Sequence, residues 1–299
     1  MGRVTVRRPV TRITLGEGTS RRSDSLTAEE PLEIRLDGTA LAVTMRTPGN
    51  DIELAHGFLA TEGIIAGPDD VLTARYCAGA VEELDELLVD GAAGDGLRVL
   101  DQPTTRNTYN VLELKLAPHV PPPAVDPTRN FYTTSSCGVC GKASIDAITQ
   151  QLRWDVASDP VRLDPAIIAE LPDRLREHQR TFSRTGGLHA AGLFSAAGEL
   201  LHSAEDVGRH NAVDKVIGWA LLNGRLPATG SVLVVSGRAS FELTQKALMA
   251  GIPALAAVSA PSSLAVECAE EAGMTLFGFV RPPRLNVYTR ADRVVTASD

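Results

Sequence analysis

Residues 231–280 read SVLVVSGRASFELTQKALMAGIPALAAVSAPSSLAVECAEEAGMTLFGFV and decide the fold of this chain. Apolar runs at 231–237, 252–259 and 274–280 alternate with two helical patterns, which end at Gly251 and Gly273. Short apolar runs bounded by turn residues are typical of buried strands, and strands that alternate with helices form parallel sheets. The stretch therefore predicts an α/β unit in which helices cover a parallel sheet.

Ligand-binding residues are expected where these strands end, because open α/β sheets bind ligands beyond the carboxyl ends of their strands. Glycine lets a backbone approach a ligand, serine donates a hydrogen bond, and an arginine can bind a phosphate through two hydrogen bonds. Serine and glycine also occur in such loops for turn and capping reasons. The candidate segments are Ser236-Gly237-Arg238, Ser259 to Ser263 and Phe277 to Arg281. They predict a nucleotide-like ligand, although the chain contains neither a Walker motif nor GxGxxG.

The first half of the chain has a different pattern. Residues 31–46 alternate as a hairpin around Asp37-Gly38, Asp51 begins an amphipathic helix, and residues 111–117 form a strand pattern. The proline-rich segment at 119–129 is typical of a stiff connector. These patterns favour three parts: an N-terminal arm (1–28), a smaller α+β domain (29–124) and a larger α/β domain (125–299).

Two cysteines, Cys137 and Cys140, form a CxxC motif just before a helical pattern that starts near Gly141. A helix N-terminus and the nearby Lys142 favour the thiolate, which is the nucleophilic form of cysteine. Three functions fit the pair: half of a structural zinc site, a dithiol redox switch, or a cysteine that carries sulfur as a persulfide. The zinc site lacks a second ligand pair and the redox switch lacks a thioredoxin-like βαβ context. The pair alone does not select the third.

Bulk properties define the setting. The chain has 299 residues, of which 43% are hydrophobic, and only four cysteines, which are too few for a disulfide framework. Its net charge of −8 argues against broad nucleic-acid binding. It shows neither a signal peptide nor an apolar run long enough to span a bilayer. We expect a soluble cytoplasmic protein.

Ionisable residues gather between the CxxC segment and the strands, in residues 186–218. Asp206 and His210 are spaced to pair, whereas His189, His202 and His210 could each be satisfied within the fold, and for each histidine alone we favour that structural role. A zinc deaminase would need His-x-Glu and Pro-Cys-x-x-Cys. Here His189 is followed by two alanines and Cys137 is preceded by serine, so the zinc signature is missing.

Several long motifs, in order, closely resemble the FdhD family of formate dehydrogenase accessory sulfurtransferases. The resemblance covers most of residues 30–290. The motifs are ELAHGFLATEGII, TTSSCGVCGKAS, GGLHAAGLF, EDVGRHNAVDKVIG, SGRASFELTQKALMAGIPALAAVSAPSSLAVE and FGFVR.

The resemblance implies a protein that accepts sulfur from a cysteine desulfurase as a persulfide. It would then pass this sulfur to the molybdenum or tungsten bis-pyranopterin guanine dinucleotide cofactor for the formate dehydrogenase catalytic subunit. The persulfide cysteine falls on Cys137, with Cys140 as its partner. The cofactor-contacting stretch falls on Leu276, Phe277, Gly278, Phe279, Val280 and Arg281, next to the loops that carry Ser236, Gly237, Arg238 and Ser259.

The same resemblance implies a homodimer and a larger three-layer αβα domain similar to cytidine deaminases, without zinc. GDP would mimic part of the cofactor. Two other functions stay open: a non-enzymatic cofactor chaperone whose CxxC senses redox state, and a zinc-dependent hydrolase on a deaminase-like scaffold.

Overall fold

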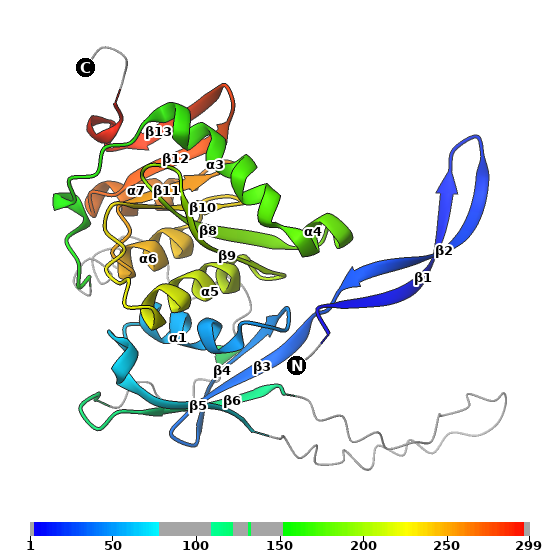
Figure 1. Ribbon diagram of the computed structural model, residues 1–299, viewed down its shortest axis with the longest axis horizontal. Coiled ribbons are helices and arrows are strands. Elements are labelled where there is room, and N and C mark those ends of the chain that lie inside the picture. Colours follow the sequence, from blue (N-terminus) through cyan, green and yellow to red (C-terminus); the bar gives the residue numbers. More distant parts are fainter. Residues whose placement is uncertain (1–2, 78–108, 122–130, 133–151, 296–299) are drawn as a thin grey trace.

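The structure is a computed structural model that describes residues 3–77, 109–121, 131–132 and 152–295. Its main element is a six-stranded sheet with the order β13-β12-β11-β10-β8-β9 (Figure 1). The three central strands are parallel, and the other three run antiparallel to their neighbours. The strands are β8 (His189–Ser195), β9 (Leu200–Asp206), β10 (Ser231–Val235), β11 (Ala254–Ala257), β12 (Thr275–Arg281) and β13 (Arg284–Thr289).

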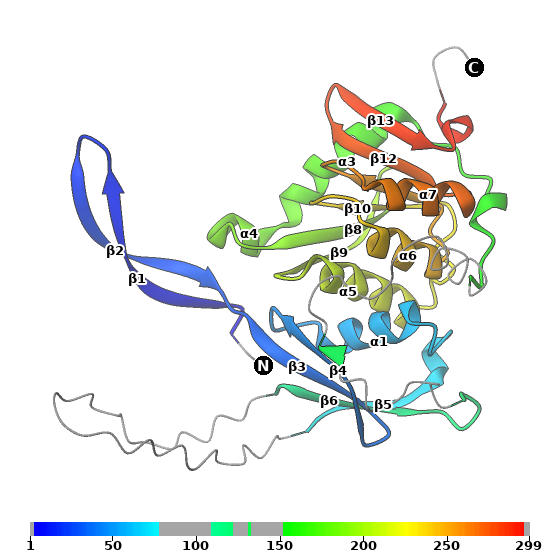
Figure 2. The same cartoon turned by 180° about the vertical axis from the view of Figure 1, so that it is seen from behind.

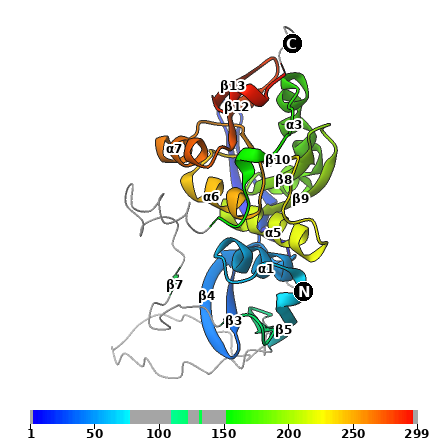
Figure 3. The same cartoon turned by 90° about the vertical axis from the view of Figure 1, so that its left-hand side faces the viewer.

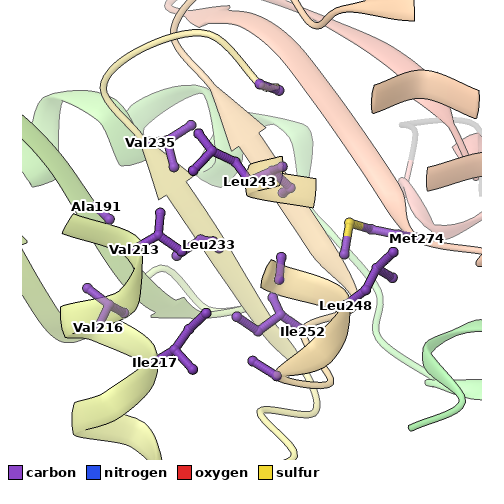
Figure 4. Close-up of a cluster of buried hydrophobic side chains, with 14 of the residues drawn as sticks. Ala191, Val213, Val216, Ile217, Leu233, Val235, Leu243, Leu248, Ile252 and Met274 are labelled. Atoms are coloured by element: carbon purple, nitrogen blue, oxygen red, sulfur yellow. The ribbon is translucent and has the colours of Figure 1, made fainter. Parts of the chain in front are cut away.

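Helices cover both faces of this sheet, because its central strands are apolar on both sides. Val232 and Val234 of β10 face α3, whereas Leu233 and Val235 face the opposite helices (Figure 4). These two clusters of buried side chains give three layers, as Figure 3 shows. The helices are α3 (Pro165–His178) on one face and α5 (Arg209–Leu222), α6 (Phe241–Met249) and α7 (Ser263–Glu271) on the other.

A second sheet, with the order β5-β6-β3-β4-β7, packs on α1 (Asp51–Thr61). The face of the sheet toward α1 is apolar and buried, and its side chains include Leu32, Ile34 and Leu112. The β3–β4 turn uses Asp37 and Gly38, both with positive φ, which confirms the predicted hairpin. The strands are β3 (Glu30–Leu36), β4 (Thr39–Arg46), β5 (Val71–Cys77), β6 (Val111–Leu116) and β7 (Phe131–Tyr132).

Helices α1 and α5 hold the two sheets together through a close crossing. Gly57 of α1 lies against the backbone of Asp214, and Gly218 of α5 lies against the backbone of Glu53. A Cβ atom at either glycine would overlap a carbonyl oxygen of the other helix. The absence of a side chain at these two positions therefore sets how closely the helices approach.

The N-terminal segment forms a long two-stranded ribbon of β1 (Thr5–Thr14) and β2 (Gly18–Thr27). It extends away from the two sheets in both Figure 1 and Figure 2. The sequence predicted an arm here but not its strands.

The predicted strand and helix alternation after Ser231 is confirmed, as are the helices that begin after Asn50 and Gly208. The antiparallel strands β8, β9 and β13 were not predicted. The proposed domain limits and the similarity to cytidine deaminases stay predictions, and the strand β7 of the smaller sheet comes from beyond residue 124. Among the helices of the described ranges, none has the length and apolarity needed to cross a bilayer.

Candidate functional site

The predicted ligand loops lie side by side at the carboxyl edge of β10, β11 and β12. The Ser259 amide donates to the Gly237 carbonyl at 3.3 Å, and the Phe279 amide donates to the Ser259 carbonyl at 3.2 Å. These two hydrogen bonds extend the pairing of the parallel strands into their loops. The structure therefore brings Gly237, Ser259 and Phe279 into one row, as expected for strands that end at the same edge.

Residues 276–281 differ from one another in what they offer to a ligand. Leu276, Phe277 and Val280 are fully buried within the two cores, so their side chains do not face solvent. Phe279 has a positive φ of 52° and is 40% exposed. Arg281, the last residue of β12, is also exposed. Within this stretch the side chains open to a ligand are thus those of Phe279 and Arg281.

Gly278 has a packing reason to be glycine. A Cβ atom there would lie 2.9 Å from Pro261 Cδ and 2.9 Å from Tyr288 Cε2. Both distances are shorter than van der Waals contacts allow. The register of β12 against β13 also shifts between Gly278 and Arg281. This irregular backbone directs the Phe279 side chain toward solvent, whereas in a regular strand the side chains would point alternately to the two faces of the sheet.

The β10 loop makes a second part of this edge. The Ser236 hydroxyl accepts a hydrogen bond from the Ala190 amide at 2.9 Å and keeps its own proton for another acceptor. A Cβ on Gly237 would be 3.7 Å from His189 Nδ1, so the imidazole lies beside this glycine. Arg238 is exposed. The loop therefore places a hydroxyl and an open backbone next to His189, and the exposed Arg238 follows in the same loop.

His210, in the first turn of α5, faces Glu242 in the first turn of α6. Nε2 of His210 lies 3.9 Å from Glu242 Oε2, too far for a hydrogen bond, and has no hydrogen-bond partner among the described residues. Burial, together with Arg209 and Lys246, lowers the pKa of His210 to about 4. Burial and Arg209 also lower the pKa of His189. Both imidazoles are therefore neutral at pH 7.

A groove of about 500 Å³ opens beside this edge on the α3 side. His189, Ser236 and Val258 line it from the sheet. Opposite them, the Arg176 guanidinium lies 4.1 Å from the centre of the Phe182 ring, which belongs to α4 (Arg180–Thr185). A positive group stacked on an aromatic ring is a surface suited to a planar or anionic ligand.

The groove residues of α3 and α4 were not among the predicted site residues. A signal for α3 was present: Asp164 caps its first turn through the Ala166 amide, Pro165 follows, and buried side chains recur at Ile168, Leu171 and Leu175. Proline inside this helix, at position 172, weakens the pattern. The position of Arg176 and Phe182 across the groove from the sheet edge depends on the tertiary fold and has no sequence signal.

Most of the ionisable cluster at 205–215 has a structural role. The spacing had suggested that Asp206 pairs with His210. In the structure, Asp206 forms an ion pair with Lys215 at 2.7 Å instead. Asp214 binds Lys246 at 2.8 Å. Lys215 also donates a hydrogen bond, at 3.0 Å, to the carbonyl of Thr47, which directly follows β4 of the smaller sheet. Such buried pairs fix the position of α5 against α1 and β4, and they leave Arg209 and His210 at the site.

The CxxC cysteines, Cys137 and Cys140, lie outside the described residues. Of the other two thiols, Cys268 is 2% exposed, and burial raises its pKa to about 11. Cys77 is partly exposed at the end of β5. Within the described part of the chain, no three His, Cys, Asp or Glu side chains are grouped closely enough to hold a metal ion.

Comparisons with known proteins agree on one family. The FdhD/NarQ family model matches residues 27–295. "Sulfur carrier protein FdhD" of Streptomyces coelicolor is 58% identical over 295 residues, which cover 98% of this chain and 97% of that protein. The protein of the same name from Mycobacterium tuberculosis is 54% identical over 294 residues, which cover 98% of this chain and 100% of the relative.

A solved structure shows the same fold. It is the crystal structure of a proposed formate dehydrogenase accessory protein from Desulfotalea psychrophila, with a TM-score of 0.71 over 98% of this chain and 100% of that chain. The two sequences are 21% identical, so this likeness concerns the fold alone. The family model and the curated relatives carry the assignment: the chain belongs to the FdhD/NarQ family.

Proposed function

We propose that this protein is a sulfur carrier for formate dehydrogenase. The observation that carries the proposal is its 58% identity, over almost its whole length, to a protein named sulfur carrier protein FdhD. The sulfur donor would be a cysteine desulfurase, and the acceptor would be the molybdenum or tungsten bis-pyranopterin guanine dinucleotide cofactor. This places the protein in the cytoplasm with the desulfurase and the dehydrogenase catalytic subunit as partners.

The sulfur steps use the two cysteines of the CxxC motif. The Cys137 thiolate attacks the outer sulfur of the desulfurase persulfide, the donor's S–S bond breaks, and the desulfurase cysteine leaves as a thiolate. Cys137 then holds the persulfide. Attack by the Cys140 thiolate on the Cys137 sulfur releases the outer sulfur as sulfide to the metal and leaves a Cys137–Cys140 disulfide. A dithiol reductant must then restore both thiols.

The carboxyl edge of the large sheet supports the cofactor part of the proposal. Arg238 and Arg281 are exposed cations at this edge, and Ser259 lies between their two loops, where its amide and carbonyl bond Gly237 and Phe279. Guanidinium groups bind phosphates through paired hydrogen bonds, so the guanosine diphosphate half of the cofactor fits here. The Arg176–Phe182 stack of the groove offers a platform for a flat ring. GDP would occupy part of this site, and the larger domain would resemble cytidine deaminases without their zinc.

Mass spectrometry of the intact protein and its peptides tests the sulfur step. The protein is incubated with a cysteine desulfurase and cysteine. We expect the Cys137 peptide to gain one sulfur atom, and Cys137→Ala to lose this gain. Cys140→Ala should still load sulfur but should not release it as sulfide. Cys77→Ser is the matched control, because Cys77 is partly exposed and lies outside the motif.

Equal sulfur loading of Cys137→Ala and wild type would show that Cys137 is not the carrier. If neither protein gains sulfur while the desulfurase is active, the chain is better described as a cofactor chaperone with a redox-sensing CxxC. The described residues of the carboxyl edge would then carry the function.

A further inference from the structure

The groove beside the carboxyl edge contains a buried amide that the fold does not use fully. Arg176 of α3 lines the groove together with Gln179, the residue that caps the end of α3. Gln179 is only 5% exposed. Its Oε1 accepts from Arg176 Nη1 at 3.5 Å, but its Nε2 has no hydrogen-bond partner within the part of the chain that the structure describes. An unpaired buried donor is unfavourable, so we expect a ligand to bring an acceptor to Gln179.

Asp173 adds a carboxylate to the same groove. It is exposed and takes part in neither an ion pair nor a hydrogen bond with another described residue. The adjacent cation, Arg174, is engaged elsewhere, with Glu170 at 2.8 Å and with the Gly198 carbonyl at 2.7 Å. An ionised carboxylate only accepts hydrogen bonds. The groove therefore offers an acceptor at Asp173 and a donor at Gln179.

The remaining surface of the groove suits a flat ring. The Arg176 guanidinium lies 4.1 Å from the centre of the Phe182 ring, so the two planes form one stacking surface. Gly186 also lines the groove, and no atom lies within 4 Å of where its Cβ would be. A planar heterocycle therefore has room in the groove next to groups that can pair with its edge.

The combination of one acceptor and one donor favours a particular ring edge. A 2-amino-4-oxopyrimidine edge presents a ring N–H and an amino group to a carboxylate, and a carbonyl oxygen to an amide N–H. Guanine and pterins share this edge. Adenine carries an amino donor where guanine has its carbonyl oxygen, so it would set a donor against the Gln179 donor.

We propose that this groove recognises the 2-amino-4-oxopyrimidine edge of its ligand. Asp173 accepts from the ring N–H and the amino group, and Gln179 donates to the carbonyl oxygen. The inference rests on the proposed function, whose cofactor contains both guanine and a pterin-derived ring. It assigns selection of the ring to α3 and the residue after it.

The groove is continuous with the loop proposed to bind phosphate. His189 and Ser236 line its sheet side, and the His189 imidazole lies beside Gly237. Arg238 follows in the same loop. A nucleotide whose base occupies the groove would therefore extend its phosphates toward Arg238, which makes guanine the first ring to test.

Isothermal titration of the full chain with GDP, IDP and ADP tests the selection. IDP lacks only the 2-amino group of GDP, and ADP carries adenine. Wild type should bind GDP at least about tenfold more tightly than either. Asp173→Asn should weaken GDP binding about tenfold and reduce the preference for GDP over IDP to less than about threefold. Glu177→Gln removes an exposed carboxylate of α3 that does not line the groove, and should bind all three as wild type does.

Gln179→Met should change a different preference. It removes the donor at similar side-chain size, so GDP and IDP, which share the carbonyl oxygen, should both bind about tenfold more weakly. ADP binding should stay within about threefold of wild type. Misfolding would weaken all three nucleotides equally, and the exposed Asp173 gives a second variant that does not disturb the core.

A pterin without a nucleotide, 6-hydroxymethylpterin, separates the two sources of the edge. If Asp173→Asn weakens the pterin and not GDP, the groove holds the pterin-derived ring. Equal binding of the three nucleotides, with a pterin affinity that Asp173→Asn leaves unchanged, would overturn the inference and leave the proposed function in place. So would equal effects of Asp173→Asn and Glu177→Gln. If neither GDP nor the pterin binds wild type, the cofactor part of the proposed function fails as well, whereas sulfur loading of Cys137 is measured separately.

Discussion

At the scale of single residues, Arg238 and Arg281 define what the carboxyl edge can bind. Both side chains are exposed. Arg238 lies in the loop after β10, and Arg281 is the last residue of β12. We predict that Arg238→Gln with Arg281→Gln weakens GDP binding at least tenfold, because charge-assisted hydrogen bonds to phosphate are lost. Isothermal titration with GDP measures the effect.

The matched control is Arg225→Gln. Arg225 follows the C-terminal end of α5, at the far end of the helix from Arg209, and its guanidinium lies 5.5 Å from the Trp219 ring centre. It should bind GDP as wild type does. If the double variant and the control bind GDP equally well, the phosphates lie elsewhere and the cofactor part of the proposed function is wrong.

Arg238 and Arg281 could be predicted as site residues, because strand ends can be recognised from apolar runs and glycines. Which side chains of residues 276–281 face outward could not be predicted. Leu276, Phe277 and Val280 belong to the buried cores. A strand with helices on both faces is apolar throughout, so its sequence does not reveal orientation. The ion pair of Asp206 with Lys215 was also not predicted, because the packing of α5 against β9 decides which charged side chain reaches Asp206.

At the scale of elements, the crossing of α1 and α5 depends on two glycines. In an isolated helix, Gly57→Ala would stabilise by about 0.5–1 kcal/mol, because alanine is the better helix former. Here the new methyl group would overlap the Asp214 carbonyl and push the helices apart. We predict instead a loss of about 3 kcal/mol in the free energy of unfolding, measured by urea denaturation.

Gly67→Ala serves as the comparison. Gly67 has a φ of −142°, and a Cβ atom there meets nothing within 4 Å. This variant should stay within about 0.5 kcal/mol of wild type. A stabilised Gly57→Ala protein would show that the helices are not in close contact.

Both helices could be predicted from periodicity and from the residues that precede them, Asn50 and Gly208. Their contact could not, because glycine inside a helix pattern usually reads as a weak position. The strands β8 and β9 were missed since their sequence, with glycine, alanine and histidine, lacks the β-branched residues that mark strands.

At the scale of the whole molecule, the elements were easier to predict than their assembly. The alternation of strand and helix patterns after Ser231 predicted the parallel centre of the large sheet, and the hairpin pattern at residues 31–46 predicted the first two strands of the smaller sheet. The placement of α5 between them depends on buried polar contacts of Asn211, Asp214 and Lys215, which join segments more than 150 residues apart. Such long-range contacts leave no local pattern in the sequence.

The same burial makes the whole fold sensitive to acid through its histidines. Burial is the first cause that lowers the pKa of His56, His189, His202 and His210. The unfolded chain binds protons at these residues near pH 6.5, whereas folded His210 binds one only near pH 4. Between these values the unfolded state holds more protons, so stability decreases as the pH falls from about 6.5 to about 4.

We predict that His210→Gln reduces this loss, because glutamine does not titrate. The His210 side chain is 24% exposed, so we discount the full shift and expect wild type to lose about 2 kcal/mol more than the variant between pH 7 and pH 4.5. Urea denaturation at both pH values gives the difference. His178→Gln, at an exposed position of α3, should follow the wild-type pH dependence. Parallel curves for wild type and His210→Gln would mean that His210 is not buried in its neutral form, and the assignment of a neutral imidazole at the carboxyl edge would fail with it.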